Sequence, residues 1–364
     1  MFRMVLMMRY WAYMFIMGIL FYLMFGYFLP YVSLSSILIV LVIILPIFYL
    51  CIAVHELGHL LFGFISGYKF GYLTIGLFTI YKGNKKLNMT LKHRGLTGQC
   101  LMLPSDDYEK FKFVYYHLGG VVMNALFATV SMSVLIVRLN GYFATITLIT
   151  FFMMNIVLIL YNAVPNSKED EPNDVSNVIA ASKSSESKRG LFLIHCVESK
   201  FLDGGRFRDF DENIFKRKQN NTSCNFLVEN ITLFEARRLF DAGDYNAAKS
   251  IYTPLEYSIF PATYRNEAIV EFLYCCILTR DYDKAQDVFN ENEALFSSNK
   301  LESSRLLAAY ENFVLRKNDR CEELIAMAKK EARNIFIEGY RIMELDYILE
   351  LERAIQESKE GSFA

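Results

Sequence analysis

The hydrophobic pattern divides the chain near residue 165. Residues 10–54 contain no Asp, Glu, Lys or Arg, and this 45-residue stretch holds two transmembrane helices at about 20 residues per span. Two further apolar stretches, at about 118–138 and 141–162, predict two more spans. We therefore expect the first half of the chain to be a polytopic α-helical membrane protein with about four transmembrane helices.

The first two spans are predicted to turn at residues 30–33, which makes residues 1–33 an N-terminal transmembrane anchor. A cleavable signal peptide is the alternative for the first segment. Its apolar core, however, exceeds the roughly 7 to 15 residues of such peptides, and no small-x-small cleavage site follows. The second span runs from about 34 to 64, which is longer than a bilayer needs, and Pro46 predicts a kink within it.

Charge predicts the orientation of these spans. Residues 1–165 carry 11 Lys/Arg and 4 Asp/Glu, whereas residues 166–364 carry 27 and 35. The loop between the second and third spans contains eight Lys/Arg, the first external turn none, and the second only Arg138. Because Lys and Arg in short loops resist translocation, we expect both termini in the cytosol.

The predicted cytosolic loop, residues 68–116, contains two runs of β-forming residues. These runs, 72–81 and 87–91, are separated by Gly83, Asn84 and three lysines. The pattern predicts a small β-hairpin lying against the membrane. An amphipathic loop without regular pairing is the alternative.

Beyond residue 225 the pattern becomes helical and repeats. Segment 243–248 resembles segment 280–285, which lies 37 residues later, and an apolar pair follows each at the same offset. A fainter third copy puts Asn318 and Ile325 in register. A period of this length is typical of stacked helix pairs and predicts tetratricopeptide-like (TPR-like) helical hairpins, with an ordinary helical bundle as the alternative.

The chain is thus predicted to have four parts. These are the anchor (1–33), a membrane core (34–180), a linker (181–224) and a cytosolic all-α helical-hairpin repeat domain (225–357). Seven cysteines without a Cys-x-x-Cys indicate reduced intracellular thiols, not a disulfide framework. No basic patch is interleaved with aromatic residues, so a nucleic-acid partner is not expected.

A candidate zinc site lies in the far end of the long second span, in the order His55-Glu56-Leu57-Gly58-His59. Residues i and i+4 share one helix face, so His55 and His59 can both bind one Zn²⁺ while Glu56 reaches a coordinated water as general base. Ionisable groups in an apolar span are costly and persist mainly where they face one another or an ion. Three such groups in five residues therefore predict a functional site.

Catalytic zinc needs a third protein ligand. Asp170, Asp174 and Asp203 are the candidates after the last span. His93 and His117 are expected near the membrane surface, and His195 in the core of the soluble part.

These motifs resemble the site-2 protease family of intramembrane zinc metalloproteases. The likeness covers about residues 34–180 and includes the motif of residues 55–59, a Gly-x-x-x-Asn at Gly120 to Asn124, and an Asn-x-x-Pro at Asn162 to Pro165. The resemblance implies that the third ligand is an aspartate after this proline. It also implies that Asn124, with Gly120, lies near the zinc and holds the substrate carbonyl or stabilises the oxyanion.

The chain departs from the family pattern at two places. Val121 replaces the usual proline, and no Asp-Gly follows Pro165 at once. Asp174 best reproduces the residues that follow the family's aspartate, although Val175 replaces glycine and the spacer is longer. Asp170, which has the usual distance, is the runner-up, and Asp203 more simply belongs to a turn.

The resemblance implies a membrane-spanning zinc endopeptidase that cleaves single-span membrane substrates: signal-peptide remnants, peptide precursors or tethered regulators. The predicted hairpin would receive the unwound substrate, and the helical tail would bind a protein partner. The resemblance and compact four-span build point to a bacterial plasma membrane. A catalytically degenerate membrane scaffold that presents the helical repeats is the alternative, and a metal transporter has too few intramembrane ligands.

Overall fold

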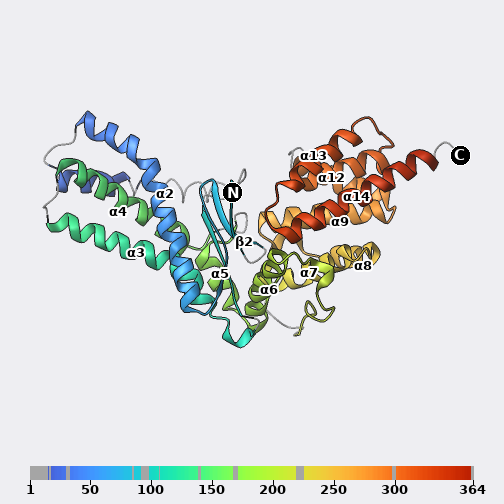
Figure 1. Ribbon diagram of the computed structural model, residues 1–364, viewed down its shortest axis with the longest axis horizontal. Helices are drawn as coiled ribbons and strands as arrows, with labels where there is room; N and C mark the ends of the chain where they lie inside the picture. The colour runs from blue at the N-terminus through green and yellow to red at the C-terminus, as the bar shows by residue number, and fades with distance from the viewer. Residues whose placement is uncertain are drawn as a thin grey trace. The chain divides into compact units, whose positions relative to one another are not determined.

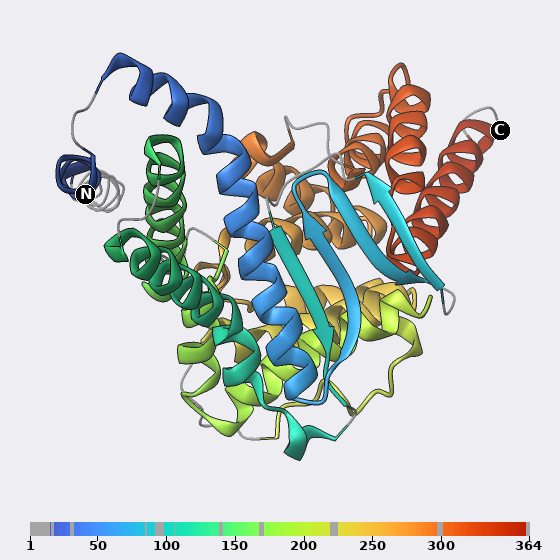
Figure 2. The same ribbon diagram turned by 60° about the vertical axis from the view of Figure 1, so that its left-hand side comes forward.

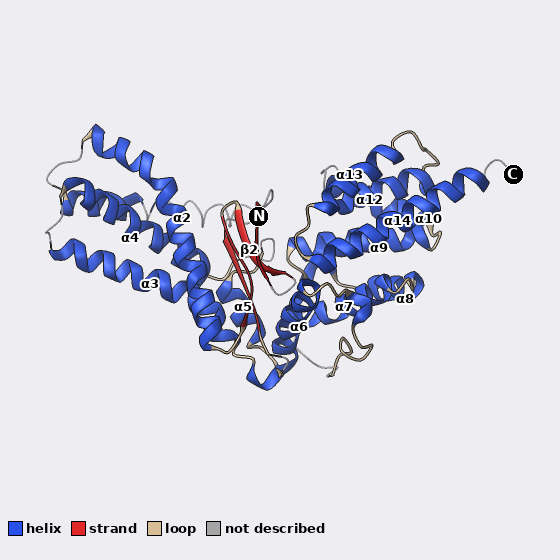
Figure 3. Ribbon diagram, viewed as in Figure 1, coloured by secondary structure: helices blue, strands red, loops and turns tan. Residues whose placement is uncertain are grey.

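The computed structural model describes residues 15, 18–29, 33–83, 86–91, 98–105, 107–137, 141–166, 171–218, 225–296 and 301–361. The chain divides into two compact units, which are described separately. The first comprises residues 1–167 and 172–179, and the second residues 168–171 and 180–364. Helices predominate in both, and the strands that the structure describes form one antiparallel sheet in the first unit (Figures 1 and 3).

Three helices of the first unit are long and apolar enough to cross a membrane. They are α2 (Leu34–Ile65), α3 (Phe113–Val137, preceded by the 3₁₀ turn Tyr108–Lys110) and α4 (Tyr142–Ala163). They match the predicted spans at 34–64, 118–138 and 141–162. Of the first predicted span, the structure describes only the shorter apolar helix Gly18–Phe28, and the rest lies outside the described residues.

Local sequence explains where α2 begins. The side chain of Ser33 accepts a hydrogen bond from the backbone N–H of Ser36, and the Ser36 hydroxyl accepts one from the Ser33 N–H. This reciprocal capping box satisfies two donors that would otherwise lack partners at the helix start. Pro46 lies inside α2, where the sequence predicts a kink.

The sheet has four strands in the order β3-β2-β1-β4, with every neighbouring pair antiparallel. The strands are β1 (Lys69–Ile75), β2 (Phe78–Gly83), β3 (Lys86–Leu91) and β4 (Gly98–Leu103). The run predicted as one strand, 72–81, is in fact two, because Gly76 adopts φ 58° in a two-residue turn between the paired Ile75 and Phe78. Glycine takes this conformation without the cost of a Cβ, and the turn lies hidden in an apolar run.

The strand that sequence did not predict, β4, lies directly beside α2 (Figure 2). A Cβ on Gly63 of α2 would come within 2.7 Å of the Met102 side chain, so the glycine admits the strand. Cys100, Leu101 and Met102 are buried, whereas the side chains of β3, at the other edge, are mostly exposed. The sheet therefore has one edge against the helix and one open edge.

The second unit is built from helix pairs. Its elements are α6 (Ser185–Leu202), α7 (Phe226–Asp241), α8 (Tyr245–Tyr252), α9 (Ala262–Leu278), α10 (Tyr282–Glu291), α11 (Glu293–Phe296), α12 (Leu301–Ala309, continued by the π turn Tyr310–Val314), α13 (Cys321–Arg333) and α14 (Glu338–Gly361), with short 3₁₀ turns at Phe207–Asp209 and Tyr257–Ile259. The predicted repeat copies fall on the turns α7–α8, α9–α10 and α12–α13. Gly243 has φ 82° and Arg280, at the equivalent position, φ 60°. The two turns thus share a left-handed residue.

The segment predicted as a linker, 181–224, contains α6 and belongs to the second unit. Leu193, Val197 and Phe201 of α6 are buried in the same core as α7 and α9. Their spacing of four residues gives the helix an apolar face, which explains why it packs and does not form an open linker.

Candidate metal centre

The candidate metal centre begins with two histidines on α2. His55 and His59 are one helical turn apart, both are 6% exposed, and their Nε2 atoms lie 3.1 Å from each other. The i, i+4 spacing therefore directs both rings to one point, as predicted.

Asp174 completes this group at the first residue of α5 (Asp174–Ala181). Its Oδ2 lies 3.1 Å from Nε2 of His55 and 3.3 Å from Nε2 of His59. Burial raises the pKa of the Asp174 carboxyl, but His59 and hydrogen bonds with the neighbouring histidines outweigh it and hold this pKa well below its usual value. The carboxyl is thus an anion that faces two imidazoles.

The Nδ1 atoms of His55 and His59 are each hydrogen-bonded to a carbonyl oxygen. Nδ1 of His55 donates to Oδ1 of Asn124 at 2.6 Å, and Nδ1 of His59 donates to the backbone oxygen of Tyr116 at 2.9 Å. A carbonyl can only accept, so each neutral ring carries its hydrogen on Nδ1 and a lone pair on Nε2. Metal-ligating histidines are usually held in this way.

With both rings neutral, three lone pairs converge at 3.1 to 3.3 Å: two from imidazoles and one from the Asp174 carboxylate. Acceptors at this separation repel unless a proton or a metal cation lies between them. Ligands about 2.0 to 2.1 Å from a tetrahedral zinc are about 3.4 Å apart, close to the observed spacing. The donor set and its dimensions therefore fit Zn²⁺.

Hydrogen bonds between the end of α4 and the start of α5 hold Asp174 near the histidines. The side chain of Asn173 donates to the backbone oxygens of Tyr161 and Val164, both at 2.7 Å, and accepts from the Ser176 N–H. The Ser176 hydroxyl donates to Asn166 at 2.8 Å. These bonds tie the start of α5 to the end of α4, so the longer spacer still brings the aspartate to the site.

Glu56 lies between the histidines and the sheet and is 6% exposed. It interacts electrostatically with both histidines and with Asp174, and it accepts a hydrogen bond from the backbone of Cys100 on β4. A Cβ on Gly98 would come within 2.5 Å of Glu56 Oε1. The edge of β4 therefore fixes this carboxylate beside the candidate ligands.

Glycines bring α2 and α3 into contact at the site. A Cβ on Gly58 would lie 2.4 Å from the backbone oxygen of Gly119, and one on Gly119 would lie 2.7 Å from that of Gly58. A Cβ on Gly120 would lie 2.5 Å from the His55 ring. The first pair permits close helix packing, and Gly120 leaves room for the imidazole.

Asn124 has a different environment from the predicted oxyanion site. Its Oδ1 accepts from His55, and its Nδ2 donates to the backbone oxygen of Cys51 at 3.2 Å and to Oδ1 of Asn155 at 2.7 Å. Both ends of the amide are engaged, so its geometry positions His55 instead of presenting a donor to substrate.

The remaining predicted residues have simpler places. Asn162 donates to the Leu158 backbone oxygen within α4, and Pro165 lies two residues beyond the end of that helix. Asp203 caps the C-terminus of α6 in the second unit, a turn as expected, while Asp170 and His93 lie outside the described residues.

Four residues near the centre make contacts that the sequence did not predict. His117 was expected only near the membrane surface, but its Nδ1 lies 3.9 Å from Oδ1 of Asp174. Tyr116 acts through its backbone oxygen, which no motif reveals, and Asn173 precedes the aspartate. Asn155 is a fully buried amide in an apolar helix, and that polarity was a usable signal.

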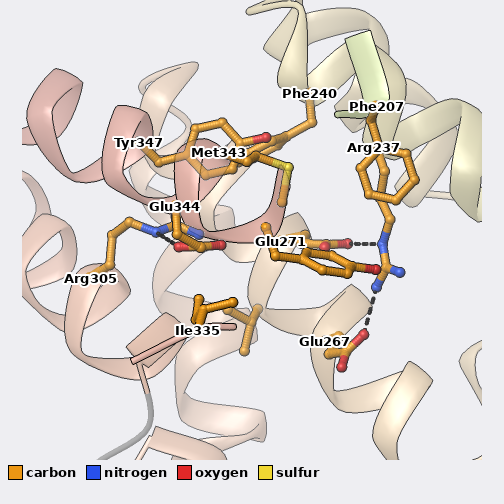
Figure 4. Close-up of a pocket in the computed structure, with 12 residues that line it drawn as sticks. Phe207, Arg237, Phe240, Glu267, Glu271, Arg305, Ile335, Met343, Glu344 and Tyr347 are labelled. Carbon is orange, nitrogen blue, oxygen red and sulfur yellow. Dashed lines mark hydrogen bonds and ion pairs between the residues drawn. The ribbon is translucent and has the colours of Figure 1, made fainter. Parts of the chain in front are cut away.

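The second unit contains a cavity of about 220 Å³ between helices (Figure 4). Arg237 donates to Glu267 at 2.9 Å and to Glu271 at 3.0 Å, while Arg305 donates to Glu344 at 3.1 Å. Each arginine is thus neutralised inside the cavity, and these ion pairs join helices of different pairs.

Comparisons with protein-family models, with curated proteins and with solved structures each gave no match for this chain.

Proposed function

We propose that this protein is an intramembrane zinc metalloprotease. The observation that carries the proposal is the convergence of three possible ligand atoms, from the buried His55 and His59 and from Asp174, beside a fourth ionisable group, Glu56. When bound there, a zinc ion supplies Lewis acidity, which polarises a peptide carbonyl and acidifies water. Three long apolar helices, two of which carry parts of the centre, support a site within a membrane.

Glu56 is the proposed general base. It lies on the same helix as both histidines, one residue from His55, and the backbone of Cys100 orients it. In this position it accepts a proton from water and later delivers it to the leaving amine. Asn124 and the Tyr116 carbonyl hold the two imidazoles meanwhile.

The proposed substrate is a membrane-spanning segment. A substrate helix has to unwind before cleavage, because its carbonyls are bonded to amides four residues ahead. An extended segment can then pair with a sheet edge, as peptides do in β-augmentation. β4 lies against α2, so we propose that the segment pairs with β3, the other edge of the sheet, whose side chains are mostly exposed.

The proposed topology places both termini in the cytosol of a bacterial cell, with the helical unit as a partner-binding domain. The charge pattern of the loops supports this orientation. Reporter fusions at residue 140 and at the C-terminus test it, since the first should report the external side and the second the cytosol.

Zinc content and proteolysis test the proposal in two steps. Purified wild-type protein should hold about one zinc per chain, His55→Ala and Asp174→Ala should lose it, and Asp203→Ala should retain it. Glu56→Gln should also retain zinc but leave uncut membrane substrates, detected by N-terminal peptide profiling of cells that carry either form. Glu109→Gln, an exposed glutamate of the same unit, is the matched control.

The second candidate is a degenerate scaffold that presents the helical unit to a partner. Val175, where the family pattern has glycine, favours it. Identical peptide profiles for wild type and Glu56→Gln, with zinc retained in both, would support the scaffold and refute the protease.

A further inference from the structure

Asn155 is a buried amide of α4 that no motif includes and that the proposed chemistry does not use. It is 0% exposed, as is Asn124 on α3. These two side chains and His55 come from three different apolar helices, and they form one continuous chain of hydrogen bonds.

The direction of this chain is fixed at the α4 end. Nδ2 of Asn155 donates to the backbone oxygen of Phe151 at 2.8 Å and to Sγ of Cys51 at 3.3 Å. A backbone carbonyl only accepts, so the Asn155 amide must direct its NH₂ toward Phe151 and its oxygen toward Asn124.

The orientation of Asn155 in turn fixes the orientation of the Asn124 amide. Nδ2 of Asn124 meets two acceptors, Oδ1 of Asn155 at 2.7 Å and the backbone oxygen of Cys51 at 3.2 Å. A reversed Asn124 would bring its oxygen against both of them. Its Oδ1 is therefore left to face His55, where only an N–H can satisfy it.

We infer that Asn155 is a positioning residue that, through Asn124, holds His55 in the tautomer with its hydrogen on Nδ1 and its lone pair on Nε2. The inference rests on the proposed zinc site and assigns a third helix to it. If Asn124 reversed, His55 would accept at Nδ1 and carry its hydrogen on Nε2, and it would then have no lone pair for a metal.

The test is zinc affinity, measured by chelator competition on full-length protein in detergent. Asn155→Leu, which keeps the branched shape but removes the acceptor, should weaken zinc binding by about 10- to 100-fold, the range for loss of such partners. Asn155→Asp keeps an oxygen facing Asn124, and burial in an apolar helix favours its protonated form, which can still donate to Phe151. It should bind zinc within about threefold of wild type, since the acceptor is retained.

Thr150→Val is the matched control. Thr150 is also 0% exposed and lies on the same helix, but its hydroxyl donates only to the Ile146 backbone oxygen among the contacts described. It should leave zinc affinity unchanged, and thermal unfolding of each variant checks that the fold is kept.

The outcomes separate the two ideas. Wild-type affinity in Asn155→Leu, an equal loss in Thr150→Val, or no recovery in Asn155→Asp would overturn the inference while the zinc site stands. A wild-type protein that takes up no zinc would refute the proposed function and this inference with it.

Discussion

Gly120→Ala tests whether His55 must lie where the structure places it. The new Cβ would stand 2.5 Å from Cε1 and Nε2 of the imidazole and 2.7 Å from Nδ1. Ordinary contact distances begin at 3.4 Å, so the ring must move by about 1 Å. His55 cannot swing freely, because its Nδ1 is bonded to Asn124.

The expected magnitude follows from two opposed terms. Alanine in place of glycine within a helix normally stabilises by about 0.5 to 1 kcal/mol. Against this, a ring shift of about 1 Å far exceeds the roughly 0.2 Å tolerance of metal–ligand distances. We therefore expect zinc affinity to fall at least about tenfold, or 1.4 kcal/mol, while the helix itself remains folded.

The assay is zinc affinity by chelator competition, with helicity from circular dichroism. Gly26→Ala is the control, since it lies in the apolar helix Gly18–Phe28 and a Cβ there meets nothing within 4 Å. It should bind zinc as wild type does. If Gly120→Ala does so too, His55 is not the ligand that the geometry requires, and the reasoning fails.

Three further predictions concern other buried groups. Tyr116→Phe removes the hydroxyl that donates to the Cys100 backbone oxygen. It should lower the free energy of unfolding by about 1 to 2 kcal/mol. Because the backbone carbonyl of residue 116 is kept, a loss of zinc in this variant would contradict the role assigned to that carbonyl. Burial raises the pKa of Glu198 to about 7 from 4.5, so the folded chain holds this proton more tightly than the unfolded chain. Stability should then fall by about 1 to 3 kcal/mol between pH 4.5 and 7, and an unchanged slope for Glu198→Gln in pulse proteolysis would refute this. Glu344→Gln leaves the buried Arg305 without its carboxylate and should cost about 3 kcal/mol, measured by denaturant unfolding; a wild-type midpoint would show that the aromatic rings around Arg305 suffice.

The sequence pattern was sufficient to predict those features that depend on the spacing of residues within one helix. The apolar stretches predicted α2, α3 and α4, and the i, i+4 spacing predicted that His55 and His59 converge. The family-like motifs pointed to Asp174, and the structure brings its carboxylate to both rings. These features depend on short-range geometry, which a sequence states directly.

Features that depend on tertiary contact were missed. β4 has no distinctive alternation and is buried because α2 covers it. The turn at Gly76 lies within an apolar run, so the run is predicted as a single strand. The segment of α6 is predicted to be a linker because its many charged residues obscure the apolar face that packs in the core. The orientation of the Asn124 amide depends on Asn155, which lies 31 residues away on another helix. No local sequence pattern relates Asn155 to His55.

The charge balance of the centre argues for the kind of ion it would hold. His55 and His59 have their Nδ1 hydrogens bonded to carbonyl oxygens, so they would bind a metal as neutral rings, whereas Asp174 and Glu56 can each contribute one negative charge. A divalent cation makes this buried group neutral, and a monovalent cation leaves it with a net charge. Uncompensated charge between apolar helices is costly, so electrostatics and the imidazole ligands both favour a divalent metal such as zinc.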